Sequence, residues 1–178
     1  MRHPNLLRRD DSVLVVVDVQ AALLPAIAGQ EGLLANVHLL VETAKILGIP
    51  TLITTQYAAR LGESVVPGSS FDKLCFSCAG ADGFCEALAE TGRRQVLLCG
   101  VETHICVSQT AHDLLARGFQ VNVAPDAVSS RTVEKHKLGM ERMRDAGVLP
   151  VAAEAAVYEW LERAGTPEFK AILPLVKS

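Results

Sequence analysis

Short runs of apolar, mostly β-branched residues recur along the chain and constrain its fold more than any other feature. The runs are VLVVV at 13–17, TLIT at 51–54, VLLC at 96–99, VNV at 121–123 and, more weakly, VLPV at 148–151. Their apolar residues are continuous rather than alternating, which is typical of strands that are covered on both faces. The sequence therefore predicts the buried strands of a parallel sheet.

Amphipathic patterns of helical length lie between these runs. One covers 33–47, a second covers 104–117, and a third is expected to have Ser130 as its N-cap and to end at Ala146. Strands that alternate with helices of this length indicate an α/β fold, in which helices cover both faces of a mostly parallel sheet. A last short helix is predicted to begin near 166–167 and to dock on the domain or on a partner subunit.

Size and composition restrict the classes of protein to which the chain can belong. Its 178 residues are expected to form a single domain over 1–178. The net charge is −3, aromatic residues make up 4%, and no stretch combines basic with aromatic residues, so no nucleic-acid partner is expected. The longest apolar run is too short to span a membrane. An odd number of cysteines, five, and no recognisable secretory signal predict a reducing, cytoplasmic location.

One interval, 56–80, interrupts the alternation of strands and helices. It shows neither a clear strand nor a clear helix, so it is either a functional loop or contains a short hidden element. Within it, CFSC at 75–78 has the spacing of zinc and thiol-redox motifs. A zinc site would need a second cysteine pair, and a thioredoxin-like site would need a strand that 71–76 does not supply. We therefore interpret both cysteines as packing residues.

Polar residues stand where the first two predicted strands end or soon after. Ligands of parallel sheets bind beyond the carboxyl ends of the strands. Asp18 follows VLVVV directly, and a carboxylate at a buried sheet edge must be paired, so it is a candidate catalytic group or a capping residue. Gln20 shares its face and is either a site residue or an exposed amide. Lys73 lies in the irregular interval and could reach the same edge, although a single lysine is usually solvated.

The stretch GVETHICVSQT at 100–110 passes from a predicted strand into a predicted helix. Thr103 as N-cap would place Cys106 in the first helical turn, where the dipole and free N–H groups favour a thiolate and can bind an oxyanion. The alternative is a small buried hydrophobe. His104 is expected to line a pocket or an interface, since residues two apart in a helix point to different sides. The sequence contains no phosphate-binding glycine motif, which argues against a nucleotide cofactor.

With these residues marked, the sequence resembles the isochorismatase-like cysteine hydrolases. The resemblance covers nearly the whole chain and rests on VVVDVQ, FDKLCFS and CGVETHICV, in that order. The stretches TTQYAARLGESV, DAVSSR and TPEFKAILPLVK are similar to the branch of isochorismatase-domain-containing proteins, whose physiological substrates are largely undefined.

The resemblance implies a fold and a set of catalytic residues. The fold is a three-layer α/β/α arrangement, Rossmann-like, with a six-stranded parallel sheet, often assembled into homo-oligomers. The catalytic triad would consist of Asp18, Lys73 and Cys106. A non-proline cis peptide would precede the nucleophile turn at Val101–Glu102, and the backbone N–H groups of Glu102 and Cys106 would form the oxyanion hole.

Departures from the wider superfamily indicate the chemistry. Nicotinamidases carry an Asp/His metal cluster after the second strand, where this chain has Gln56 and Tyr57, so no catalytic metal and no cofactor are expected and both residues become pocket lining or structural residues. Isochorismatases that cleave a vinyl ether lack the cysteine. The resemblance therefore implies hydrolysis of a C–N bond, amide or imide-like, in a small molecule. Two alternatives remain: a non-catalytic binding or scaffold protein, and a thiol-based redox protein that uses Cys106 or Cys75 with Cys78.

Overall fold

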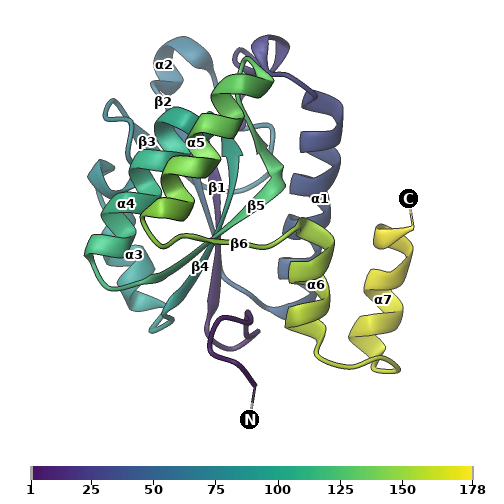
Figure 1. Cartoon of the computed structure of the whole chain (residues 1–178). Helices are drawn as coiled ribbons and strands as arrows, with labels where there is room; N and C mark the ends of the chain where they lie inside the picture. The colour runs from purple at the N-terminus through teal and green to yellow at the C-terminus, as the bar shows by residue number, and fades with distance from the viewer. Residues whose placement is uncertain (1, 178) are drawn as a thin grey trace.

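In the computed structural model, which describes residues 2–177, six strands form one sheet in which every neighbouring pair is parallel (Figure 1). The strand order is β3-β2-β1-β4-β5-β6. The strands are β1 (Ser12–Val17), β2 (Thr51–Gln56), β3 (Ser70–Lys73), β4 (Gln95–Val101), β5 (Gln120–Ser129) and β6 (Leu149–Pro150). The predicted fold class, with a parallel six-stranded sheet, is confirmed.

Helices cover both faces of the sheet. Figure 1 shows α1, α6 and α7 on one face and α3, α4 and α5 on the other. The helices are α1 (Gln30–Leu47), α2 (Ala58–Leu61), α3 (Phe84–Glu90), α4 (Ser108–Ala116), α5 (Val133–Asp145), α6 (Ala153–Leu161) and α7 (Pro167–Val176). Short helical turns are η1 (Leu24–Ala26), η2 (Cys78–Gly80) and the π-helical η3 (Thr103–Val107).

The central strand β1 explains why its apolar run is continuous. Leu14 and Val16 belong to the apolar cluster that includes residues of α1, α6 and α7. Val13, Val15 and Val17 belong to the second cluster, with residues of α3, α4 and α5. Successive side chains of a strand point to opposite faces, so a strand covered on both faces requires an apolar residue at every position.

The irregular interval 56–80 contains three short elements that the sequence pattern did not reveal: α2, β3 and the turn η2. The sequence of β3 is SFDK, and it lies at the edge of the sheet, where only its inner neighbour β2 pairs with it. Such a strand tolerates polar residues because its side chains are only partly covered. It therefore lacks the continuous apolar run by which a buried strand is recognised in a sequence.

Two predicted helix starts have different outcomes. Thr166 caps α7, since its hydroxyl accepts a hydrogen bond from the Phe169 N–H at 3.1 Å, and α7 packs on α1 of the same chain. The predicted N-cap of α5, Ser130, is wrong. The cap is Thr132, whose hydroxyl accepts a hydrogen bond from the Lys135 N–H at 3.2 Å, and the helix begins at Val133.

In the described part of the chain, none of the helices combines the length and apolarity that crossing a membrane requires.

Candidate active site

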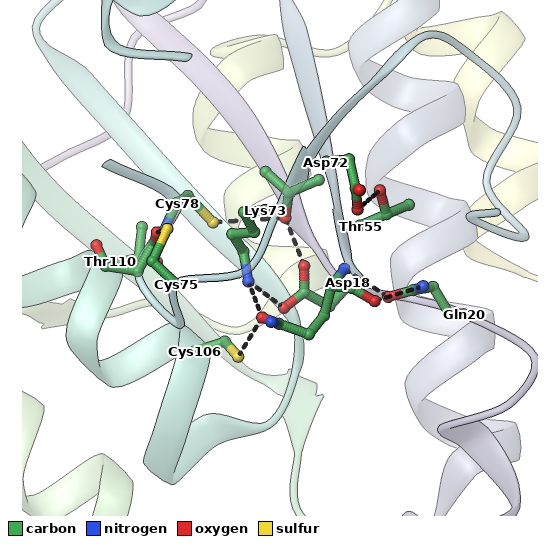
Figure 2. Close-up of polar contacts among 12 residues, drawn as sticks. Asp18, Gln20, Thr55, Asp72, Lys73, Cys75, Cys78, Cys106 and Thr110 are labelled. Carbon is green, nitrogen blue, oxygen red and sulfur yellow. Dashed lines mark hydrogen bonds and ion pairs between the residues drawn. The ribbon is translucent and has the colours of Figure 1, made fainter. Parts of the chain in front are cut away.

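Four polar side chains from separate parts of the sequence meet at the carboxyl edge of the sheet (Figure 2). Asp18 follows β1, Gln56 ends β2, Lys73 ends β3, and Cys106 lies in η3 just beyond β4. This is the edge at which parallel sheets bind ligands. The structure therefore brings together the three residues of the expected triad, with Gln56 between them.

Asp18 is fully buried, and both of its carboxylate oxygens accept hydrogen bonds. Oδ1 accepts from the Thr54 hydroxyl at 2.8 Å, and Oδ2 accepts from the Lys73 ammonium at 2.7 Å. The backbone of Asp18 has a φ of 51°, a conformation that residues other than glycine adopt rarely and that is common at functional sites. The chain therefore turns sharply at the point where the carboxylate is presented.

Lys73 reaches Asp18 from two strands away, since β2 lies between β3 and β1. Neighbouring strands are about 4.8 Å apart, so only a long side chain can bridge this gap. Burial alone would lower the pKa of Lys73, but the negative charge of Asp18, with a smaller effect from Cys106, raises it above its ordinary value. The ammonium is therefore charged, and its ion pair with Asp18 is shielded from water.

Cys106 is buried, with 7% of its surface exposed, and its thiol contacts Gln56 Oε1 at 3.9 Å. Burial chiefly, and then the charge of Asp18, raise the pKa of Cys106 to about 12, although Lys73 opposes this. The resting group is thus a thiol, whereas the sequence had suggested a thiolate. The difference arises because Cys106 lies inside a buried π-helical turn rather than in the open first turn of an α-helix.

The start of η3 differs from the predicted capped helix. Thr103 is the first residue of the turn rather than its cap, and its hydroxyl pairs with His136 Nδ1 at 3.0 Å. The Val101–Glu102 peptide is cis, as the resemblance implied. The Glu102 carboxylate binds Arg131, whose guanidinium lies 2.7 Å from Oε1 and 3.1 Å from Oε2. Burial opposes ionisation of Glu102, but Arg131 lowers its pKa, so the side chain is held as a carboxylate.

Helix α5 packs closely on this turn because Gly139 faces it. A Cβ atom at Gly139 would lie 2.8 Å from the Cα of His104, closer than packed carbon atoms approach. His104 is partly exposed, and its Nδ1 lies 2.9 Å from the Ser130 hydroxyl. Burial lowers the pKa of His104, although Glu102 opposes this, so the ring is neutral at pH 7.

The two glutamines and the tyrosine expected around the site differ in exposure. Gln20 is fully buried, and its amide binds the backbone N–H and C=O of Gln56, at 2.8 and 3.1 Å, and the Gly62 carbonyl at 2.6 Å. It holds two chain segments together and is therefore not the exposed amide that the sequence left open as an alternative. Gln56 is half-buried beside Cys106, whereas Tyr57 is 42% exposed with the Arg60 guanidinium 6.0 Å from its ring.

Sequence reasoning did not identify two residues that also contact this network. Thr54 supplies the second hydrogen bond to Asp18, and the Cys78 sulfur lies 3.4 Å from the same hydroxyl. Because Thr54 donates to the carboxylate, the Cys78 thiol is the donor in this contact. Burial raises the pKa of Cys78 to about 11, so it stays protonated. The signal available in the sequence was the pair of threonines at the end of the buried strand TLITTQ.

Asp18, Lys73 and Cys106 are buried, and the described residues provide no cluster of three His, Cys, Asp or Glu side chains that could hold a metal ion. A cleft of about 860 Å³ lies elsewhere, lined by residues from the N-terminal segment and the ends of α1 and α6. None of Asp18, Lys73 and Cys106 lines it. The size of a cavity therefore does not mark the position of the converging polar groups in this protein.

Comparison with known proteins gives the family. The isochorismatase domain matches residues 12–155. The secreted isochorismatase effector Isc1 of Phytophthora sojae is 38% identical over 93% of this chain and 84% of its own length. Isochorismatase domain-containing protein 1 of Salmo salar is 35% identical over 94% of this chain, which spans 61% of that relative.

Solved structures agree with this assignment. MAR1 ribonuclease from Caenorhabditis elegans superposes with a TM-score of 0.89 at 31% identity, over 97% of this chain and 92% of that one. The octameric YcaC hydrolase of unknown specificity from Escherichia coli has a TM-score of 0.89 over 98% and 92% of the chains, at 22% identity, which supports the fold alone. The chain therefore belongs to the isochorismatase family of hydrolases.

Proposed function

We propose that the protein is a cysteine hydrolase that cleaves a C–N bond, amide or imide-like, in a small molecule, with Asp18, Lys73 and Cys106 as its catalytic residues and no cofactor. The observation that carries this proposal is the buried Lys73–Asp18 ion pair, 2.7 Å long, beside the thiol of Cys106. A charge pair removed from water in this way is costly to maintain, and such groups are concentrated at functional sites.

In the first step, the Cys106 sulfur attacks the carbonyl carbon while Asp18 accepts the thiol proton. A thiol whose pKa is raised to about 12 needs a base in its immediate surroundings, and Asp18 is the carboxylate whose charge acts on it. Lys73 offsets the repulsion between the carboxylate and the developing thiolate. The three residues thus work as a charge-balanced set.

The oxyanion that forms is bound by the backbone N–H groups of Glu102 and Cys106, each contributing about 3 kcal/mol to transition-state stabilisation. Asp18 then gives its proton to the nitrogen and the C–N bond breaks. The amine departs, and the acyl group remains on Cys106 as a thioester. Water then attacks the thioester while Asp18 takes a proton from it. The C–S bond breaks, Asp18 returns the proton to the sulfur, and the acid leaves. Tyr57 and His104 are proposed to line the space that the substrate occupies.

Assembly and location belong to the same proposal. The apolar side chains of Leu74 and Phe76 are 71% and 52% exposed, in the loop that follows β3. Together with the octamer formed by the Escherichia coli neighbour, this exposure supports self-association, which light scattering would detect as a mass above that of one chain. All five cysteines are free, which supports a reducing compartment such as the cytoplasm.

The test is a screen of small amides and imides with the wild-type protein, Cys106→Ala and a matched control, Cys85→Ala. We expect Cys106→Ala to reduce turnover by about 10⁴-fold or more, and Cys85→Ala, which removes another partly buried thiol, to leave it unchanged. Mass spectrometry of the quenched reaction should find the acyl group on the peptide that contains Cys106.

Three outcomes would contradict the proposal. Turnover that survives Cys106→Ala would exclude the cysteine as nucleophile. Cleavage of RNA without cleavage of any amide would favour the activity for which the Caenorhabditis elegans neighbour is named. A protein that turns over neither substrate class, and whose Cys106 is never acylated, would fit the binding-protein alternative.

A further inference from the structure

Gln56 occupies the space between the catalytic lysine and the catalytic cysteine, and its neighbours fix it on several sides. Its backbone N–H and C=O are both held by the buried amide of Gln20. Its side-chain nitrogen donates to the Leu74 carbonyl at 3.0 Å. Its side-chain oxygen accepts from Lys73 Nζ at 2.7 Å and lies 3.9 Å from Cys106 Sγ. The amide can therefore present only its oxygen to the other two groups.

The chemistry of the partners explains why this oxygen must belong to a neutral group. A lysine ammonium only donates hydrogen bonds, and a thiol donates its S–H to an oxygen. A single acceptor can serve both. An amide oxygen does so without adding a charge beside the sulfur, whereas a carboxylate would add one.

We infer that Gln56 is a positioning residue that holds the Cys106 thiol and the Lys73 ammonium on one uncharged acceptor and thereby sets how readily the thiol ionises. This inference rests on the proposed function, because it gives Gln56 a role in preparing the nucleophile rather than in contacting substrate. The hydrogen bond from the thiol stabilises the protonated form. The hydrogen bond from Lys73 to Gln56 occupies one N–H of the ammonium, which is then not available to stabilise a thiolate at Cys106.

The charged and titratable groups that act on Cys106 come from several elements packed against η3. They are Asp18 after β1, Lys73 on β3 and Cys78 in η2. The titratable groups at the turn itself have other partners: Glu102 binds Arg131, His104 pairs with Ser130, and His136 of α5 pairs with Thr103. A change at Gln56 therefore acts on a sulfur that already faces one negative and one positive group.

Two substitutions of similar size should move the thiol in opposite directions. Gln56→Glu places a second negative charge near the sulfur and should slow alkylation of Cys106 by iodoacetamide about tenfold at a fixed pH, equivalent to a pKa higher by about one unit. Gln56→Leu removes the acceptor and frees a Lys73 donor, so alkylation should become several-fold faster. Rates are read by peptide mass mapping from about pH 7 to about pH 10, a range below the raised pKa of the thiol.

The opposite signs separate this role from a purely structural one. A change in access to the sulfur would alter both variants in the same direction, because glutamate and leucine are both close to glutamine in size. Gln30→Glu, the same substitution at the start of α1, is the matched control and should leave the rate unchanged. Alkylation of Cys85 in every sample, with thermal unfolding, checks that the fold is intact. If one Gln56 variant does not fold, the other is still expected to change the alkylation rate in its own direction, slower for glutamate or faster for leucine. No change, or the opposite change, would overturn the inference.

Equal rates in wild type and both variants, or changes of the same sign, would overturn the inference. Asp18→Asn distinguishes this failure from failure of the proposed function. Removal of that carboxylate should speed alkylation, since Asp18 raises the pKa of the thiol. If Asp18→Asn has this effect and the Gln56 variants have none, only the role of Gln56 is wrong. If Asp18→Asn has no effect either, the charge-balanced triad falls with it.

Discussion

The carboxyl edge of the sheet, where the parallel strands end, and the amino edge, where they begin, use polar side chains in different ways. At the carboxyl edge, Asp18, Lys73 and Gln56 bond to one another through their side chains. At the amino edge, Arg93 donates to backbone carbonyls of Arg9 and Ser12, at 2.6 and 2.8 Å. Side chains that bond to backbone stabilise the chain path, whereas side chains that bond to one another create a group with chemical properties of its own.

Solvent access separates the edges as well. The cleft of about 860 Å³ opens among charged residues of both signs at the amino edge. The carboxyl edge instead leaves Asp18 and Lys73 nearly without exposed surface. Low exposure strengthens electrostatic interactions, so the Lys73–Asp18 pair interacts more strongly than charges around the open cleft. The difference teaches that buried, converging polar groups and open volume lie at opposite ends of this sheet.

The largest effect is expected for Lys73→Met, which breaks the buried ion pair at the carboxyl edge. The Asp18 carboxylate would lose the ammonium and keep the hydrogen bond from Thr54, and a buried charge without its charged partner typically costs about 3–5 kcal/mol of unfolding free energy. Because Lys73 also lowers the pKa of Cys106, alkylation of the thiol should slow. Urea unfolding and iodoacetamide labelling measure the two effects.

The double variant Asp18→Asn with Lys73→Met is the control for this prediction. It removes both charges and retains an oxygen that can accept from Thr54, so it should recover much of the lost stability without recovering activity. A single Lys73→Met variant that unfolds at the same urea concentration as wild type would show that the two edges do not differ in this respect.

A smaller, purely structural effect is expected for Gln95→Leu at the amino edge. The buried Gln95 amide accepts from the Arg8 N–H at 2.7 Å and donates to the Leu6 carbonyl at 3.0 Å. Leaving these backbone groups unpaired should cost about 1–3 kcal/mol. Alkylation of Cys106 should not change, because the hydrogen bonds of the Gln95 side chain go to Pro4, Leu6, Arg8 and Ser12 at the amino edge. A changed alkylation rate would mean that the edges are coupled through the sheet.

Much of the fold could be predicted because β1 and β4 are buried on both faces and leave a continuous apolar signal. The candidate positions Asp18 and Cys106 follow from the same feature, since the carboxyl ends of parallel strands converge wherever the strands lie in sequence, whereas the pairing with Lys73 rested on the family resemblance. In contrast, β3 is a polar edge strand without such a signal, and the sequence placed Lys73 in a loop although it ends a strand.

The finer arrangement of the site depends on side-chain orientation, which sequence patterns do not record. Gln20 and Gln56 are both amides at strand ends, yet one is fully buried on backbone groups and the other contacts Lys73 and the thiol of Cys106. The raised pKa of Cys106 could not be foreseen either, because a cysteine at a helix start and one in a buried π-helical turn look alike in sequence.

The smallest effect is expected for Glu168→Gln, which removes an ion pair at the amino edge. Arg9 and Glu168 lie 3.5 Å apart with side chains 41% and 36% exposed, whereas the Lys73–Asp18 pair is shorter and buried. Water solvates the exposed charges almost as well as they solvate each other, and salt screens them. Arg9 also keeps its hydrogen bond to the Leu47 carbonyl. We therefore expect no measurable change in Tm, at low or high salt. A fall in Tm comparable to that of Lys73→Met would show that burial does not separate the two pairs, and the distinction between the edges would then rest on bonding pattern alone.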